Sequence, residues 1–365
     1  VSSLMQFKIN EVKKSELLKG EQNIVGVENT IIFNKINRIS GDLLYVADCL
    51  RLNDNGTADY KEVEKQWIAF SNRKMIYDQM RFIDVEGNEV IRINYSKNGA
   101  VLVNKADLQN KKDRYYFTDT IKLKENEIYI SKLDLNIENN VIEEPIKPML
   151  RISMPYYDSK GTLKGIVILN YLVSDILKQI EKVAETSNGS LFLLNADGYW
   201  IYDSNNSENA WSFMYEDKTD ISFMNKFKPE WETIQNRDSG KLINDAGVFV
   251  FSKSITSKTF KQDNIGYSFI LGLGDLTLVS YISSKSDNGK LFTQSFLMNE
   301  LMIIKNSYYV YIFTLLISII ISVLVAINKN EKDEVKYFSE YDAMTGVYNR
   351  RVGFEKLSQL YKNIG

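Results

Sequence analysis

The chain contains 365 residues, with 45 Lys and Arg against 47 Asp and Glu, so its formal charge at pH 7 is -2. This balance provides no basic surface for neutralising phosphates, and nucleic-acid binding is therefore not expected. The sequence has no histidine and a single cysteine, Cys49. This composition excludes Ser-His-Asp and Cys-His catalysis, His-ligated metals and a disulfide framework.

Residues 1–52 are predicted to form a long helix. Apolar residues alternate spacings of four and three along its second half, at Ile32, Ile36, Ile39, Leu43, Val46 and Leu50. Such a seam packs either on a partner helix in a dimer or on the chain's own domain, and the pattern leaves both interpretations open. The turn residues Asn-Asp-Asn-Gly at 53–56 are expected to end the helix. An EF-hand at this turn is excluded, because Arg51 stands where the calcium loop needs Asp.

Three hairpins are predicted between residues 75 and 203. Each consists of two β-rich runs around a glycine-containing turn, at 85–88, 158–161 and 195–198. Glycine supplies the positive φ that such turns need. Between the second and third hairpins, Ile176, Leu177, Ile180 and Val183 have helical spacing, and Asn188-Gly189 provides a C-terminal stop. The pattern predicts an α+β fold, with a first sheet domain at 53–171, a connecting helix at 172–190 and a smaller sheet domain at 191–285.

The smaller domain is expected to contain further paired strands. The runs KLINDAGVFVFSKSI (241–255) and GYSFILGLGDLTLVSYI (266–282) both resemble paired strands with glycines that are prone to bulges. Trp200 follows a hairpin turn, so the sequence favours core packing over a ligand cage at that position.

A membrane-spanning helix is predicted near the C-terminal end of the sequence. Residues 307–327 contain no charged side chain. At 1.5 Å per residue such a helix is about 31 Å long, which matches a hydrocarbon core of about 30 Å. Three tyrosines near its start suit the headgroup layer. A stalk helix at 286–306 is expected before the span and a charged linker at 328–340 after it.

Charges on the two sides of this span predict its orientation. Lys329, Lys332 and Lys336 follow the span, whereas only Lys305 lies just before it. The positive-inside rule therefore favours a cytoplasmic C-terminal side and sheet domains outside the cell. Residues 1–30 contain neither a signal sequence nor a membrane helix, so either the single span acts as a reverse anchor or the sequence is a piece of a longer chain, and we expect the second.

The arrangement resembles a double Cache module, the tandem PAS-like extracytoplasmic sensor of bacterial signalling proteins. The strings that carry the resemblance are YDQMRFIDVEGNEVIRINY, the segment from DRYYFTDT to GIVILNY, and LNADGYWIYD. It covers roughly residues 20–285. The resemblance implies a membrane-distal Cache domain at 53–171, which usually holds the small-molecule pocket, and a membrane-proximal one at 191–285.

The C-terminal end carries a second resemblance. The string DAMTGVYNRR is similar to the opening of GGDEF domains, with Met344 and Val347 in place of leucines. The matching positions are Asp342, Thr345, Gly346, Asn349, Arg350 and Arg351. A plain structural alternative is a helix-entry turn with Asp342 as the N-cap. The catalytic loop of GGDEF cyclases lies downstream of this opening, so residues 341–365 are expected to be an incomplete start of that domain and catalytically inert.

Candidate ligand residues lie on strand-like segments of the distal domain. These candidates are Arg81, Arg114, Tyr116, Tyr129, Ser131 and Asp134. Tyr129 and Ser131, two apart on a strand, would share a face. An arginine and an aspartate in one pocket would suit a zwitterion such as an amino acid, or a carboxylate held by arginine alone. The alternative is that Arg81, Arg92 and Arg151 are exposed and that Asp134 caps a turn.

The resemblances together imply a bacterial inner-membrane receptor, expected to be a homodimer, that senses a small molecule and regulates cyclic di-GMP synthesis. Mg²⁺ and GTP would serve only the missing catalytic domain, and no cofactor is expected in these 365 residues. Two alternatives stay open: a sensor with another output, such as a chemoreceptor or histidine kinase, and a standalone membrane-anchored binding protein.

Overall fold

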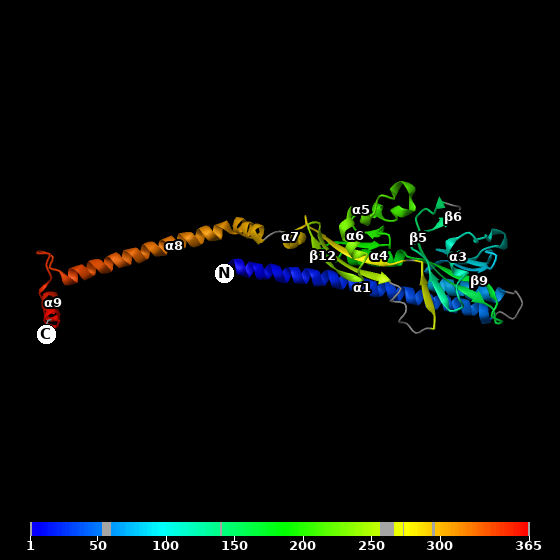
Figure 1. The fold of residues 1–365 in the computed structure, drawn as a ribbon, viewed down its shortest axis with the longest axis horizontal. Coiled ribbons are helices and arrows are strands. Elements are labelled where there is room, and N and C mark those ends of the chain that lie inside the picture. Colours follow the sequence, from blue (N-terminus) through cyan, green and yellow to red (C-terminus); the bar gives the residue numbers. More distant parts are fainter. Residues whose placement is uncertain are drawn as a thin grey trace. The chain divides into compact units, whose positions relative to one another are not determined.

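The computed structural model describes residues 2–52, 60–138, 141–255, 266–272, 274–293 and 296–363. It contains two compact units, residues 1–293 and residues 294–365. Figure 1 shows the first unit as two sheets with covering helices, along which one long N-terminal helix runs.

The N-terminal helix α1 (Ser2–Leu52) packs on the chain's own sheets. All six residues of the predicted seam are buried, and they belong to one apolar core together with residues of both sheets. The seam is therefore a core face of this unit, which decides between the two interpretations that the sequence left open. The predicted turn at 53–56, with its excluded calcium loop, lies outside the described residues.

Two buried carboxylates anchor α1, one at each sheet. Glu21 accepts hydrogen bonds from the hydroxyls of Ser187 and Ser280, both at 2.7 Å, and from the backbone N–H of Asn188 at 2.8 Å. Asp42 accepts from the hydroxyl of Tyr77 at 2.6 Å and pairs with Lys74 at 2.7 Å. Burial of charged groups is tolerated here because each carboxylate has several donors.

A third acidic residue of α1, Glu28, is buried and leads to a prediction. Burial raises the pKa of Glu28 above its ordinary value of 4.5, and Lys35 offsets this only in part. The folded state therefore holds this proton more tightly than the unfolded chain, so the charged form costs stability once the pH rises above about 4.5.

Glu28→Gln is expected to stabilise the fold near pH 7, because the amide is neutral where the buried wild-type carboxyl must carry a charge. The gain should shrink as the pH falls through 4.5, because the wild-type carboxyl then becomes neutral too. Thermal unfolding at pH 7 and pH 4, with the exposed Glu16→Gln as a matched control, checks this. An equal gain at both pH values would contradict the assignment.

The larger sheet, here named the distal sheet after the distal domain that the sequence predicts, contains eight strands in the order β14-β4-β8-β9-β1-β2-β3, with β5 paired to β8, and the smaller sheet is named the proximal sheet. Two of the predicted hairpins, β1–β2 and β8–β9, form its centre, and Gly161 has a φ of 75° in the second turn. The helix α2 (Lys61–Lys74) precedes the sheet, and η1 (Lys105–Asp107), α3 (Tyr115–Thr120), β6 (Ile137–Glu138) and β7 (Val141–Ile142) lie between its strands in sequence. The strands are β1 (Tyr77–Asp84), β2 (Glu89–Ser96), β3 (Gly99–Leu102), β4 (Glu127–Ile130), β5 (Asp134–Leu135), β8 (Pro148–Tyr157), β9 (Leu163–Leu172) and β14 (Ser268–Leu271).

The connecting helix α4 (Ser174–Ala184) leads to a second, antiparallel sheet of order β11-β10-β15-β13-β12. The third predicted hairpin is β10–β11, with Gly198 at a φ of 77°. The strands are β10 (Ser190–Leu194), β11 (Trp200–Asp203), β12 (Ser239–Asn244), β13 (Gly247–Ile255) and β15 (Leu276–Ser283), and the short helices are η2 (Ser207–Asn209), η3 (Ser212–Met214), η4 (Glu216–Lys218), α5 (Phe223–Lys226) and α6 (Lys228–Ile234).

One predicted strand pairing is wrong. The run 266–282 does not form a pair of its own, because β14 joins the distal sheet parallel to β4, whereas β15 stays in the proximal sheet. Both edges of β15 are already taken by β10 and β13. The outer edge of β4 is available, and an unpaired edge favours the addition of a strand.

The second unit contains the predicted membrane segment. Helix α8 (Phe296–Glu340) includes a stretch, Tyr308–Glu340, with a mean hydropathy of 2.9 over its best window and none of that window buried. One helix among the described residues is thus long and apolar enough to cross a membrane. The predicted stalk at 286–306 falls in α7 (Asp287–Thr293) and the start of α8, with residues 294–295 outside the described residues, and the predicted linker 328–340 is helical.

The GGDEF-like string forms a turn followed by α9 (Arg350–Lys362). The N-cap of this helix is Asn349, which accepts a hydrogen bond from the N–H of Val352 at 3.1 Å, so the alternative with Asp342 as N-cap is wrong. Asp342 instead organises the preceding turn, because its carboxylate accepts from the N–H and the hydroxyl of Thr345 at 3.0 and 2.8 Å. Gly346 lies in this turn with a φ of 65°.

Candidate ligand-binding site in the distal domain

A polar layer covers one face of the distal sheet. Side chains alternate between the two faces of a strand. In β1, Met80 and Phe82 belong to the apolar core that includes α1, whereas the alternate residues Gln79 and Arg81 make polar contacts. In β8, Ile152 belongs to the same core, and its neighbour Arg151 makes polar contacts. Both faces of these strands are buried, which explains why the sequence reads as nearly continuous apolar runs.

Tyr116 of α3 contacts two buried guanidinium groups. The guanidinium carbons of Arg81 and Arg151 lie 5.3 and 5.4 Å from the centre of its ring, within the range of a cation–π contact. The hydroxyl of Tyr116 also accepts a hydrogen bond from Arg81 at 3.2 Å. Burial raises the pKa of Tyr116, but the positive charges of Arg81, Arg151 and Lys111 outweigh burial and leave this pKa below its ordinary value.

Arg81 is held by residues of two neighbouring strands. Its Nη2 donates to Oδ1 of Asn170 in β9 at 2.7 Å, and its Nη1 pairs with Oε1 of Glu89 in β2 at 3.5 Å. Glu89 in turn accepts from the backbone N–H of Gln109 at 3.0 Å and pairs with Arg92 at 3.5 Å. The buried Nε of Arg81 has no hydrogen-bond partner among the described residues.

Arg151 is bound in a second, adjacent cluster. Its Nη1 pairs with Asp134 and donates to the hydroxyl of Tyr115 at 3.4 Å, and its Nη2 donates to Asn136 at 3.2 Å. Tyr115 donates to the other oxygen of Asp134 at 2.7 Å. Burial by itself would lower the pKa of Arg151. Asp134 and the tyrosines raise it by more than burial lowers it, so this pKa lies above its ordinary value and the guanidinium stays charged. Within the described part of the chain, its buried Nε also lacks an acceptor.

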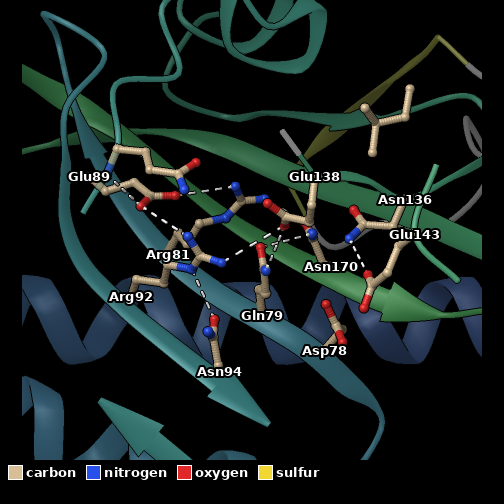
Figure 2. Close-up of polar contacts among 12 residues, drawn as sticks. Asp78, Gln79, Arg81, Glu89, Arg92, Asn94, Asn136, Glu138, Glu143 and Asn170 are labelled. Carbon is tan, nitrogen blue, oxygen red and sulfur yellow. Dashed lines mark hydrogen bonds and ion pairs between the residues drawn. The ribbon is translucent and has the colours of Figure 1, made fainter. Parts of the chain in front are cut away.

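Amide and carboxylate side chains extend this layer toward β6. Figure 2 shows Gln79 between Asn170 and Glu138, with its amide donating to Glu138 and accepting from Asn170, both at 3.4 Å. In the same view, Arg92 donates to Asn94 at 2.9 Å and Asn136 donates to Glu143 at 2.8 Å. Strands β1, β2, β6 and β9 therefore contribute polar side chains to one connected network.

The structure brings together three of the six candidates, Arg81, Tyr116 and Asp134, although Asp134 reaches the other two through Arg151. Arg114 is half-buried at the start of α3, where it donates to the carbonyl of Ile137 at 3.4 Å. Tyr129 donates to Asp119 at 2.8 Å, and burial together with Asp119 raises its pKa.

Ser131 lies just beyond the end of β4 and makes contacts to the backbone. Its hydroxyl donates to the carbonyl of Lys132 at 2.8 Å and accepts from the N–H of Arg151 at 2.9 Å. Strand β4 ends at Ile130, one residue before Ser131, but the backbone N–H of Ser131 still donates to the carbonyl of Arg151 in β8 at 2.9 Å.

The alternative interpretation of the arginines is also wrong. Arg81, Arg92 and Arg151 are 2%, 7% and 3% exposed, and Asp134 binds Arg151 instead of capping a turn. Sequence reasoning did not single out Tyr115, Asn136 or Asn170 as candidates. A usable signal was present for Arg151 and Asn170, since a polar residue within an apolar strand of ten residues needs a buried partner.

The core beside the proximal sheet is formed mainly by aromatic side chains. Trp200 is 2% exposed, as the sequence predicts, and it packs among aromatic side chains. This second core contains Phe192, Trp200, Phe223, Phe227, Trp231, Phe249 and Phe251. The buried arginine network is thus a feature of the distal domain.

Comparison of the sequence with models of known families identifies the family of this chain. The model of the bacterial histidine kinase sensor domain matches residues 44–264. No curated protein matches the sequence. A domain of a sensory box/GGDEF family protein from Vibrio parahaemolyticus has 18% identity and a TM-score of 0.59, covering 75% of this chain and 98% of that one.

Two further solved structures share the fold. The extracellular domain of a protein described as the histidine kinase vpHK1S-Z8 has 21% identity and a TM-score of 0.57, with 77% of this chain and 98% of that chain covered. The ligand-binding domain of the Campylobacter jejuni chemoreceptor Tlp3, in complex with L-valine, has 9% identity and a TM-score of 0.51, with 75% and 96% covered. The match of the family model extends over more than half of the sequence, and the chain belongs to the bacterial histidine kinase sensor domain family.

Proposed function

We propose that this extracellular sensor domain binds a small carboxylate-bearing molecule, such as an amino acid, between Arg81 and Arg151 of the distal domain. The observation that carries the proposal is the pair of buried guanidinium groups over the ring of Tyr116, each with an Nε that lacks an acceptor among the described residues. Buried donors without acceptors cost free energy. A ligand carboxylate that enters after a rearrangement of side chains would supply the missing acceptors.

The charges of the network support an anionic group on the ligand. Arg81, Arg151 and Lys111 act on Tyr116, whereas Glu89 and Asp134 are the carboxylates paired with the two guanidiniums. One positive charge is left over at the centre of the site. Asp134 is already bound by Arg151 and Tyr115, so an ammonium group would have to compete for it. The chemoreceptor with L-valine shows that a protein of this fold binds an amino acid.

A thermal-shift assay on the whole chain in nanodiscs tests this proposal. The probes are L-valine, isovalerate and isobutylamine, which separate the contributions of carboxylate and ammonium. A bound ligand at a hundred times its Kd adds about 2.7 kcal/mol, and at about 2–4 °C per kcal/mol the shift is roughly 5–10 °C. We expect stabilisation by a probe that carries a carboxylate and none by isobutylamine.

Two variants test whether the ligand binds at the arginine site. Arg81→Met should abolish the shift, while the exposed Arg237→Met should keep it. A shift retained in Arg81→Met would place the ligand elsewhere. Stabilisation by isobutylamine alone would contradict an anion site.

For the output, we propose regulation of a GGDEF domain, which would make cyclic di-GMP from GTP with Mg²⁺. The support is the DAMTGVYNRR string and the Vibrio relative, which is named as a GGDEF family protein. A histidine kinase output is the second candidate, because the family model is that of histidine kinase sensors. We further propose that the chain forms a homodimer in the inner membrane, with residues 1–293 outside the cell and residues 341–365 in the cytoplasm.

A chimera tests the output. Residues 1–365 are joined in frame to the remainder of a GGDEF catalytic domain, and cyclic di-GMP is measured in cells with and without the ligand found above. A ligand-dependent level supports the proposal. A constant level in a chimera that still binds the ligand would favour the kinase output.

A further inference from the structure

A second polar cleft lies in the proximal domain, beside the aromatic core. It has a volume of about 520 Å³, opens broadly to solvent and is formed by β11, the segment after it and α5. This volume is within the range of clefts that hold small molecules. The cleft belongs to the proximal sheet, so it is distinct from the arginine site, whose residues lie on strands of the distal sheet.

The wall of this cleft contains a buried donor without an acceptor. Trp200 lines the cleft and is 2% exposed, and its indole N–H has no hydrogen-bond acceptor within the ranges that the structure describes. Buried indole N–H groups normally find a partner. The ammonium of Lys226 lies over the same ring, 5.9 Å from its centre. Lys226 is itself exposed, so its flexible side chain can move aside and uncover the ring.

The remaining wall is held in place by its own hydrogen bonds. Asp203 accepts from the N–H of Asn205 at 2.8 Å and from the amide of Asn209 at 2.7 Å. On the opposite side, Asn225 donates to the carbonyl of Asp220 at 2.9 Å, and its N–H donates to the hydroxyl of Ser222 at 3.0 Å. These bonds leave the carboxylate of Asp220 and the ammonium of Lys226 at the rim.

We propose that this cleft is a second ligand site and that it takes a small neutral polyhydroxylated molecule, such as a monosaccharide. The lining contains the carboxylates of Asp203 and Asp220 against the ammonium of Lys226, so it is net negative, which argues against an anionic ligand. The carboxylate of Asp203 is already bound by Asn205 and Asn209. Hydroxyl groups both donate and accept, so one such ligand satisfies Asp220, Lys226 and the indole N–H of Trp200 together. Amide-rich walls beside an aromatic ring provide the directional contacts that fix such a ligand.

Tryptophan fluorescence titration of the whole chain in nanodiscs tests the proposal, with isothermal titration as a second readout. The probes are D-glucose, D-galactose, D-ribose and N-acetyl-D-glucosamine at millimolar concentrations. We expect saturable binding of at least one probe. The rim variant Asp220→Asn/Lys226→Met, which changes exposed residues only, should weaken that binding about tenfold. Trp200→Phe, which keeps an aromatic ring but removes the N–H, should weaken it as well.

Two controls separate this site from the arginine site. Lys228→Met changes another exposed lysine near the cleft that does not line it and should leave the affinity unchanged, and an excess of L-valine, a probe of the arginine site, should not displace the sugar. No saturable binding of any probe would overturn the proposal, as would an unchanged affinity in the rim variant. Displacement of the sugar by L-valine would place the sugar in the distal domain and would also overturn it.

Discussion

Arg151→Met is expected to lower the free energy of unfolding by roughly 3–5 kcal/mol, the cost of removing one partner of a buried ion pair. The side chains of Arg151 and Asp134 are 3% and 8% exposed. Among the described residues, the hydrogen bond from Tyr115 is then the one side-chain contact that Asp134 keeps. The carboxylate would remain buried with its charge uncompensated. Urea unfolding of the whole chain in detergent, followed by circular dichroism, measures this loss.

Two further variants test whether loss of the ion pair causes the loss of stability in Arg151→Met. Arg237→Met, an exposed change of the same chemistry, should alter stability by less than about 0.5 kcal/mol. The double variant Arg151→Met/Asp134→Leu should recover part of the loss, because no buried charge is then left unpaired. A double variant that is less stable than Arg151→Met alone would show that packing of the arginine stem, not its charge, supports this region.

Leu43→Ala in α1 is expected to destabilise the first unit by about 2–5 kcal/mol, the usual cost of truncating a fully buried leucine. Leu43 is 0% exposed and belongs to the core that includes strands of the distal sheet. Because this seam packs within one chain, the loss should be the same at high and low protein concentration. The measurement is urea unfolding at two concentrations that differ by about tenfold, which would shift the stability of an obligate dimer.

Val27→Ala is the matched control on the same helix, since Val27 is 58% exposed. It should change the free energy of unfolding by less than about 0.5 kcal/mol. A concentration-dependent effect of Leu43→Ala would mean that the seam contacts a second chain, and the assignment of α1 to its own core would be wrong.

Elements defined by local spacing could be predicted from the sequence. The helical face of α1 and the three hairpins repeat with the periods of helix and strand, and turn glycines separate the strands. The apolar helix near residue 308 follows from length and hydropathy alone. These features depend on residues close together in the chain, so no distant contact is needed to infer them.

The position of β14 could not be predicted in the same way. Residues 268–271 have the composition of a strand, but which edge they join depends on the edges that other strands leave open. The neighbouring strand β4 is more than a hundred residues away in sequence. The local sequence pattern cannot show that residues 268–271 join the edge of β4 and not an edge of β15, which is closer in sequence.

For the candidate site, residue types and their positions in the chain predicted arginine, tyrosine and aspartate on or beside strand-like segments of the distal domain, and the structure places the candidates Arg81, Tyr116 and Asp134 in one buried network. Contacts between distant segments determine the rest: Arg81 and Arg151 both lie over the ring of Tyr116, Asn170 binds Arg81, and Arg114 and Ser131 bind backbone groups. Residue type limits which side chains can carry charge and hydrogen bonds. Strand register and the covering helix α3 determine which of them meet, because these contacts join residues that are far apart along the chain.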